Sequence, residues 1–158
     1  MSITSKITLK HLAGFNCLTI RKTIDFMKDY SQFAAYALEK TEKYLKNIGE
    51  EPAGAPMVCF HNMELENLDL EVGFPVAFGG ESFKAEGDLK VVEIPSMWAL
   101  CAIDRGPYEL QDPTLEAIFA EIQKGGYQMA GGIYYQYLND TERPEEEYLT
   151  FMFVPIVK

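Results

Sequence analysis

A set of residues recurs in this chain at a nearly constant spacing, and this repeat limits the possible folds more than any other feature. The matched positions are Ile7 with Leu89 and Leu9 with Val91 (82 apart), Ala53-Gly54 with Ala130-Gly131 and Asn62 with Asn139 (77 apart), and Pro75 with Pro155 (80 apart). A period near 80 is far longer than the repeats of roughly 20–50 residues from which solenoids are built. We therefore expect two copies of one supersecondary unit.

Apolar residues at helical spacing predict one helix in each copy, over 31–48 and over 113–124. The first helix shows an apolar stripe, and short polar residues, proline and glycine stand where helices begin and end. The stripe is Ala34, Leu38, Thr41, Leu45 and Ile48, and the expected boundary residues are Ser31 or Asp29, Gly49, Asp112-Pro113 and Gly125-Gly126.

Runs of β-branched and aromatic residues, bounded by turn residues, predict two strands before and two strands after each helix. These strands cover 6–12, 15–21, 57–61, 68–76, 88–93, 97–104, 133–138 and 148–157. The expected fold class is α+β, with duplicated strand-strand-helix-strand-strand units, antiparallel sheets, two main helices, pseudo-twofold symmetry and a central ligand cleft. The 158 residues fit one domain, with copies at about 5–77 and 87–157 and a linker at 78–86.

The charge balance of the chain excludes several classes of function. Fourteen Lys and Arg against 24 Asp and Glu give a net charge of −10, which argues against direct binding to nucleic acid or to anionic membranes. Cys17, Cys59 and Cys101 are odd in number and show no metal-binding spacing, so we expect reduced thiols in a cytoplasmic protein. No stretch is apolar enough for a membrane span or a signal peptide.

No familiar catalytic, phosphate-binding or zinc-binding motif occurs, and no cofactor is expected. The chain has two histidines, His11 and His61, which excludes a site built from several histidines. Since His61 stands beside Asn62 at a strand end, its position favours a turn or cap role over that of a ligand or base.

Strand alternation singles out Glu71. Leu70 and Val72 share one face of the strand over 68–76 with other core residues, whereas Asp69, Glu71 and Gly73 lie on the opposite face. A buried carboxylate must be paired or must change its pKa. Two interpretations stay open: Glu71 serves an organic cation or a proton-transfer step, or it is a structural residue that is solvated or paired with Arg21 or Arg105.

Aromatic residues make up 13% of the chain, and three tyrosines crowd one predicted strand. Tyr135 and Tyr137 share a face of one strand, beside Tyr134. Trp98 stands in another strand, and Tyr108 precedes the helix. Aromatic faces bind apolar rings and cations, although the same residues could equally form a large core.

Several phrases of this sequence resemble the GyrI-like small-molecule-binding domain, which is also the effector-binding domain of AraC- and MerR-type multidrug-sensing activators such as BmrR and Rob. The phrases appear in the family's order over about 5–157. They are Ile48-Gly-Glu-Glu-Pro-Ala-Gly54, Phe60-His61-Asn62-Met63-Glu64, Leu70-Glu71-Val72-Gly73-Phe74-Pro75-Val76, Gly106-Pro107-Tyr108, Tyr137-Leu138-Asn139-Asp140 and Val154-Pro155.

The resemblance implies a ligand cleft between two halves in a stand-alone member without a DNA-binding head. Where drug-sensing members carry acidic residues, this chain has Tyr135 and Phe151, so Glu71 is the best remaining acid. The expected ligand-binding residues are Glu71, Trp98, Tyr108, Tyr135, Tyr137, Phe151 and Phe153.

Three functions follow as hypotheses. The first is a binding protein with an aromatic cleft for bulky apolar or lipophilic cationic small molecules. The second is a hydrolase of strained-ring, cyclopropane-bearing genotoxins with Glu71 as general base. The third is an inhibitor that binds a protein partner such as gyrase.

Overall fold

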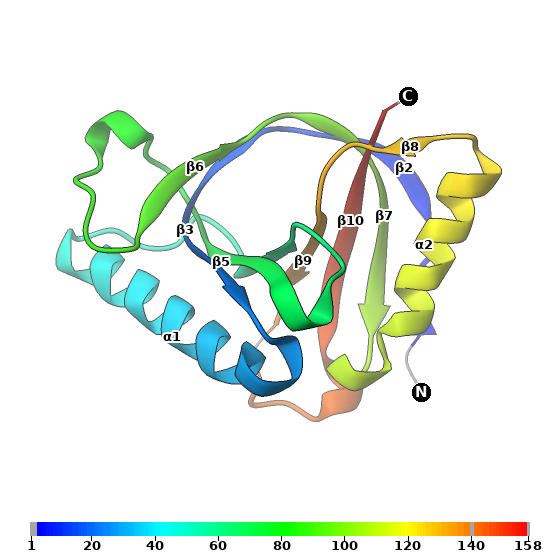
Figure 1. The fold of residues 1–158 in the computed structure, drawn as a ribbon, viewed down its shortest axis with the longest axis horizontal. Helices are drawn as coiled ribbons and strands as arrows, with labels where there is room; N and C mark the ends of the chain where they lie inside the picture. Colours follow the sequence, from blue (N-terminus) through cyan, green and yellow to red (C-terminus); the bar gives the residue numbers. More distant parts are fainter. Residues whose placement is uncertain (1–2, 140, 158) are drawn as a thin grey trace. The chain divides into compact units, whose positions relative to one another are not determined.

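The computed structural model describes residues 3–139 and 141–157, which form two compact units (Figure 1). Unit 2 comprises Gly14–Pro95, and unit 1 comprises Met1–Ala13 together with Ser96–Lys158. Each unit combines one long helix with an antiparallel sheet, which confirms the predicted α+β class. Asp140 of the family-like phrase lies outside the described residues.

Unit 2 contains four strands and the helix α1. The elements are β3 (Phe15–Ile24), α1 (Phe26–Asn47), β4 (Met57–Phe60), β5 (Leu68–Val76) and β6 (Lys90–Ile94), with short 3-10 turns at Leu65–Asn67 and Gly80–Ser82. The strand order is β4-β5-β3-β6, and each pair is antiparallel. The helix packs on β3 and β5, where alternate strand residues such as Leu18, Leu70 and Val72 are fully buried.

Helix α1 begins earlier than the sequence predicts. Asp25 is the N-cap, because its side chain accepts a hydrogen bond from the Lys28 amide, so the expected cap at Ser31 or Asp29 is wrong. The buried stripe is Phe33, Ala37, Thr41 and Leu45, one position away from the expected Ala34 and Leu38. Gly49 follows the helix with φ of +74°, as the expected C-terminal stop requires.

Unit 1 repeats this plan with two extra short strands. Its elements are β1 (Ile3–Thr4), β2 (Thr8–Leu12), β7 (Met97–Arg105), α2 (Asp112–Lys124), β8 (Gln128–Met129), β9 (Ile133–Tyr137) and β10 (Leu149–Val157), with 3-10 turns at Tyr108–Leu110 and Glu145–Glu147. Strand β7 lies between β10 and the pair β1 and β2, and β10 also pairs with β8 and β9. Helix α2 covers β7 and β10, with Thr114, Ile118 and Ile122 buried.

The strand registers of the two units agree position by position. Met57 pairs with Gly73 in unit 2, and Tyr134 pairs with Phe153 in unit 1, at displacements of 77 and 80. Likewise Leu18 pairs with Phe74, and Leu100 pairs with Val154, at displacements of 82 and 80. The two units therefore share one topology and one register, whereas a common origin of the two halves stays a prediction.

The first strand of each sequence copy lies in the sheet of the other copy. Strand β2 pairs with β7, with Leu12 opposite Met97, although β3 follows β2 after only two residues. The equivalent strand β6 pairs with β3, with Ile94 opposite Phe15. As a result, unit 1 is built from two separate stretches of the chain.

Two asparagines fix the turns that lead into β5 and β10. The Asn62 side-chain oxygen accepts the Asp69 amide at 3.2 Å, and its amide donates to the Asn67 carbonyl at 3.1 Å. Asn139 makes the same two bonds, from Leu149 at 3.0 Å and to Glu147 at 2.8 Å. This shared role explains why asparagine recurs 77 positions later.

Candidate functional site

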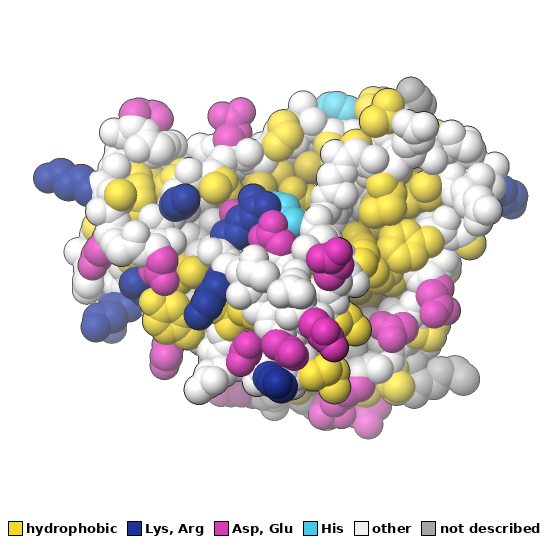
Figure 2. Space-filling model, viewed as in Figure 1, with side chains coloured by type: hydrophobic (Ala, Val, Ile, Leu, Met, Phe, Trp, Pro, Cys, Tyr) yellow, Lys and Arg dark blue, Asp and Glu magenta, His cyan; other side chains and the backbone are white. Residues whose placement is uncertain are grey.

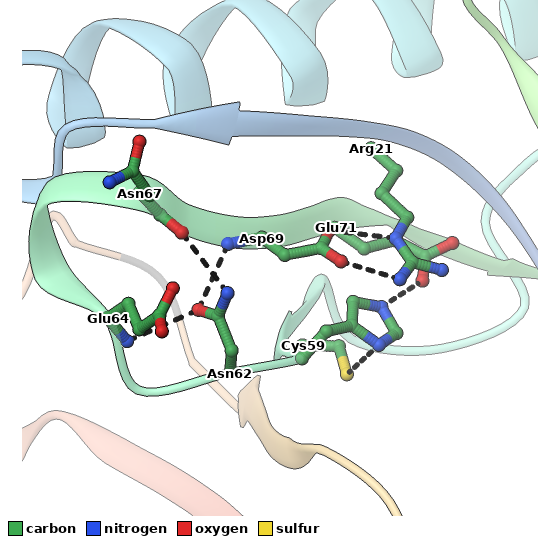
Figure 3. A network of polar contacts seen from close by, with 8 residues as sticks. Arg21, Cys59, Asn62, Glu64, Asn67, Asp69 and Glu71 are labelled. Carbon is green, nitrogen blue, oxygen red and sulfur yellow. Dashed lines mark hydrogen bonds and ion pairs between the residues drawn. The ribbon is translucent and has the colours of Figure 1, made fainter.

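Glu71 lies at the centre of a hydrogen-bonded group on the sheet face of unit 2 that is turned away from α1 (Figure 3). Its Oε2 accepts a hydrogen bond from Thr19 Oγ1 at 2.6 Å, and its Oε1 lies 2.8 Å from His61 Nε2. The side chain is buried, with 4% of the residue exposed. Glu71 is therefore a paired internal carboxylate and not a solvated edge residue.

The sheet register brings these residues together. Cys59 of β4 lies opposite Glu71 of β5, and on the other side Arg21 of β3 also lies opposite Glu71. Because paired antiparallel residues point to the same face, these side chains share the face turned away from α1. His61 follows two residues after Cys59, so it continues the same face beyond the end of β4. We call Thr19, Arg21, Cys59, His61, Asp69 and Glu71 the polar cluster.

Arg21 pairs with Asp69 and not with Glu71. Its Nε and Nη2 donate to the two Asp69 carboxylate oxygens at 2.8 and 2.7 Å, which is the bidentate geometry of a strong ion pair. This hydrogen bonding lowers the pKa of Asp69 and raises that of Arg21. The predicted alternative in which Glu71 pairs directly with Arg21 is therefore wrong, because the partner of Glu71 is His61.

Opposing effects act on the pKa of Glu71. Burial raises it, but the hydrogen bonds from His61 and Thr19, and the charges of His61 and Arg21, outweigh burial, so the pKa falls below its usual value. Glu71 is consequently a carboxylate at neutral pH. A permanent carboxylate suits the binding of a positive charge better than it suits proton abstraction.

His61 is the site residue that the sequence interpretation missed. It lies in the turn after β4, as expected, and its backbone amide closes that turn on Asp69. Its side chain, however, bonds Glu71 through Nε2, while its Nδ1 lies 3.9 Å from Cys59 Sγ. The available signal was the spacing of Cys59 and His61, which places both on the Glu71 face if the strand alternation continues past Phe60.

The corresponding face of unit 1 is aromatic. The Tyr134 and Phe153 rings stack with 4.7 Å between centroids and an interplanar angle of 2°, and Phe151 lies 5.4 Å from Phe153. Phe153 is almost fully buried at 1% exposure. We call Tyr134, Phe151 and Phe153 the aromatic face. Thus Phe151 and Phe153, predicted together, do lie together.

The other predicted aromatic residues lie on the opposite face of that sheet. Tyr135 pairs with Met152 and Tyr137 with Thr150, and Thr150 Oγ1 accepts a hydrogen bond from Gln111 beside the start of α2. Tyr135 and Tyr137 thus share a face, as expected, but it is the face that α2 covers. A single aromatic surface that joins them to Phe151 and Phe153 is therefore excluded.

Tyr108 and Trp98 also belong to the α2 side. Tyr108 packs between Tyr137 and Tyr148, with ring centroids 5.0 and 4.8 Å away. Trp98 points to the opposite face of β7 from Ala99 and Cys101, and this is the face that α2 covers. Its ring contacts the His11 ring edge-on, with 5.1 Å between the centroids. These residues are packed against other aromatic rings of unit 1.

Within the described part of the chain, no group of three or more His, Cys, Asp or Glu side chains is arranged to hold a metal ion. Also, none of the helices among those residues is long and apolar enough to cross a membrane. Figure 2 shows acidic and basic side chains on the face that it draws, with hydrophobic side chains between them. The three cysteines are buried thiols.

The fold is that of an α+β domain with two sheets. Each sheet is covered by a helix on one face, and its other face is turned away from that helix. A family model for the GyrI-like small-molecule-binding domain matches residues 5–157, so the chain belongs to the GyrI-like family. None of the curated proteins matches its sequence significantly.

Solved structures show the same fold at low identity. EcmrR in its DNA complex is 19% identical, with a TM-score of 0.83, over 97% of this chain and 57% of EcmrR. A hydrolase from Listeria innocua is 15% identical, with a TM-score of 0.66, over 96% of this chain and 92% of the hydrolase. SAV2435, solved with tetraphenylphosphonium bound, is 13% identical, with a TM-score of 0.68, over 97% of this chain and 94% of SAV2435.

Proposed function

We propose that this GyrI-like domain binds a lipophilic organic cation, and that Glu71 supplies the negative charge that the ligand meets. The observation that carries the proposal is a buried carboxylate whose pKa lies below its usual value. An internal charge costs free energy unless it is compensated. A ligand cation that reaches Glu71 would gain an interaction that is stronger than at the surface, because the local dielectric is lower.

The hydrogen bonds of the polar cluster hold Glu71 in one position even without a ligand. Thr19 and His61 each hold one Glu71 oxygen, so the carboxylate is fixed in position. A carboxylate accepts about four hydrogen bonds, so both oxygens keep capacity for a ligand that carries N–H donors, whereas a quaternary cation interacts with the carboxylate through its charge. A fixed site loses less entropy on binding than a mobile one. The tetraphenylphosphonium bound to SAV2435 is an example of the ligand class in a protein of the same fold.

Hydrolysis with Glu71 as general base is the weaker hypothesis. An efficient base has a pKa near the working pH, whereas the Glu71 pKa is lowered. Both oxygens of Glu71 already accept hydrogen bonds, which further reduces its basicity. We therefore propose a binding protein rather than a hydrolase. The expectation that its three buried cysteines are reduced supports a cytoplasmic location.

Titration calorimetry with tetraphenylphosphonium at pH 8.0 tests this function. We expect saturable binding by the wild-type protein and at least about tenfold weaker binding by Glu71→Gln, equivalent to ~1.4 kcal/mol. Glu42→Gln, which alters an exposed residue of α1, should bind like the wild type. Absence of saturable binding by the wild type, or equal affinities for the wild type and Glu71→Gln, would reject the proposal.

A further inference from the structure

The net charge of the polar cluster depends on one side chain. Arg21 and Asp69 neutralise each other through their bidentate pair. Glu71 is ionised, and its Oε1 lies 2.8 Å from Nε2 of the His61 imidazole, which is charged only when it is protonated. The cluster therefore carries a net charge of about zero when His61 is protonated and about −1 when His61 is neutral, since Thr19 and Cys59 add no charge as hydroxyl and thiol.

His61 is also the more accessible member of its pair with Glu71. Its side chain is 21% exposed, against 6% for the Glu71 side chain, so solvent protons reach the imidazole more easily than the carboxylate. The Nε2 atom faces Glu71, and the Nδ1 atom faces the Cys59 sulfur at the longer distance of 3.9 Å. An imidazolium can lose its Nδ1 proton and, as the neutral Nε2–H tautomer, keep its hydrogen bond to Glu71. Deprotonation thus requires no movement of the ring.

We propose that His61 is the built-in counter-ion of Glu71, and that binding of a cationic ligand at Glu71 drives the release of the His61 Nδ1 proton. This inference rests on the proposed function, because it concerns the same carboxylate. The His61 proton and the cationic ligand each supply one positive charge, and either of them neutralises the single net negative charge of the polar cluster. By linkage, a ligand that favours the deprotonated state must bind more weakly as the pH falls.

The other titratable groups around His61 do not change charge in the relevant range. Asp69 and Glu71 of β5 have lowered pKa values, and that of Arg21 of β3 is raised, so these three stay charged near neutral pH. Burial raises the pKa of Cys17, also on β3, which keeps it a thiol. Cys59 of β4 is fully buried. Imidazoles, in contrast, typically change charge between about pH 5 and 8.

Tetraphenylphosphonium is a suitable probe, because a quaternary cation has no proton of its own to release. We would measure its affinity by calorimetry from pH 5.5 to 8.0, in pairs of buffers with different ionisation enthalpies. If protonation of His61 opposes ligand binding, the wild-type affinity should be about tenfold lower at pH 5.5 than at pH 8.0. Release at the lower pH should approach about one proton per ligand.

Two variants separate His61 from other causes of pH dependence. His61→Gln keeps an amide donor for Glu71 but carries no charge, so its affinity should vary less than about twofold over the same range. His11→Gln changes the chain's other histidine, which contacts Trp98, and should keep the wild-type pH profile. Circular dichroism at both pH limits checks that each variant remains folded.

The outcomes distinguish this inference from the function on which it rests. Absence of wild-type binding at pH 8.0 overturns the proposed function and the inference with it. Wild-type binding with equal affinity at both pH limits and no proton release overturns the inference alone. The inference is also overturned if His61→Gln keeps the wild-type pH dependence, because another group would then be responsible.

Discussion

Replacing Gly73 with alanine should destabilise the protein strongly, because the backbone of the neighbouring strand β3 lies against the position that a Cβ would occupy. An ideal Cβ at Gly73 would lie 1.9 Å from the Leu18 carbonyl oxygen and 2.8 Å from the Thr19 Cα. Cβ atoms rarely approach other atoms closer than 3.0 Å, so the β3 backbone would have to move by more than 1 Å. Both obstructing residues are buried at 0% and 1% exposure and cannot yield toward solvent.

Overpacking of a core commonly costs about 1–3 kcal/mol, and here the clash is with backbone, so we expect at least ~3 kcal/mol. For a chain of this size, that loss lowers Tm by roughly 6–12 °C. The displacement would also disturb the 2.6 Å bond between Thr19 and Glu71. The affinity for tetraphenylphosphonium should therefore fall even at temperatures where Gly73→Ala is folded.

Differential scanning calorimetry of Gly73→Ala beside Gly80→Ala measures the effect. A Cβ at Gly80 meets no atom within 4 Å, so this control should be neutral or slightly stabilised through its less flexible unfolded chain. If the Tm of Gly73→Ala lies within about 2 °C of the control, the close approach of the β3 backbone to Gly73 is refuted.

Two further predictions concern the turns and the polar cluster. Asn62→Ala and Asn139→Ala should each lower the free energy of unfolding by about 1–2 kcal/mol in urea titrations, because each removes the two hydrogen bonds that both turns share, and Asn62→Ala also removes the one from the Glu64 amide. A loss in one variant without the other would contradict their shared role. Because the folded pKa of Glu71 lies below 4.5, its contribution to stability is present above about pH 4.5 and disappears as the pH falls through the folded value. Glu71→Gln should therefore lose less stability than the wild type between pH 5 and 3, and parallel acid-unfolding curves would refute this.

Most of the secondary structure could be predicted because it is encoded locally. The strand predicted over 68–76 matches β5 at both ends, and the helix predicted over 113–124 starts one residue late. The two-residue strands β1 and β8 are too short to show any alternation. The pairing of β2 with β7 could not be predicted either, because β3 and β7 are equivalent strands and the apolar pattern of β2 fits both of them.

The candidate site was predictable only in part, for a similar reason. Alternation placed Glu71 on the correct face, because the parity of a strand is a local property. The expectation that Tyr135 shares a surface with Phe151 and Phe153 was wrong, because the alternation of a strand does not tell which of its faces the helix covers. The role of His61 depends on contacts across strands, to Glu71 on β5, and a residue just past a strand end gives little periodic signal.

The shared register of the two units indicates where their functions can differ. Residues that set the turns and the register are equivalent, as Asn62 and Asn139 show. The faces turned away from the helices are not equivalent, since Glu71 corresponds in register to Phe151. A carboxylate in one unit and a phenyl ring in the other occupy the same place on the same scaffold without altering the pairing of the strands. The side chains on these two faces can therefore differ without a change of the fold. A search for ligands should begin on these faces rather than among Tyr135, Tyr137 and the other rings on the α2 side.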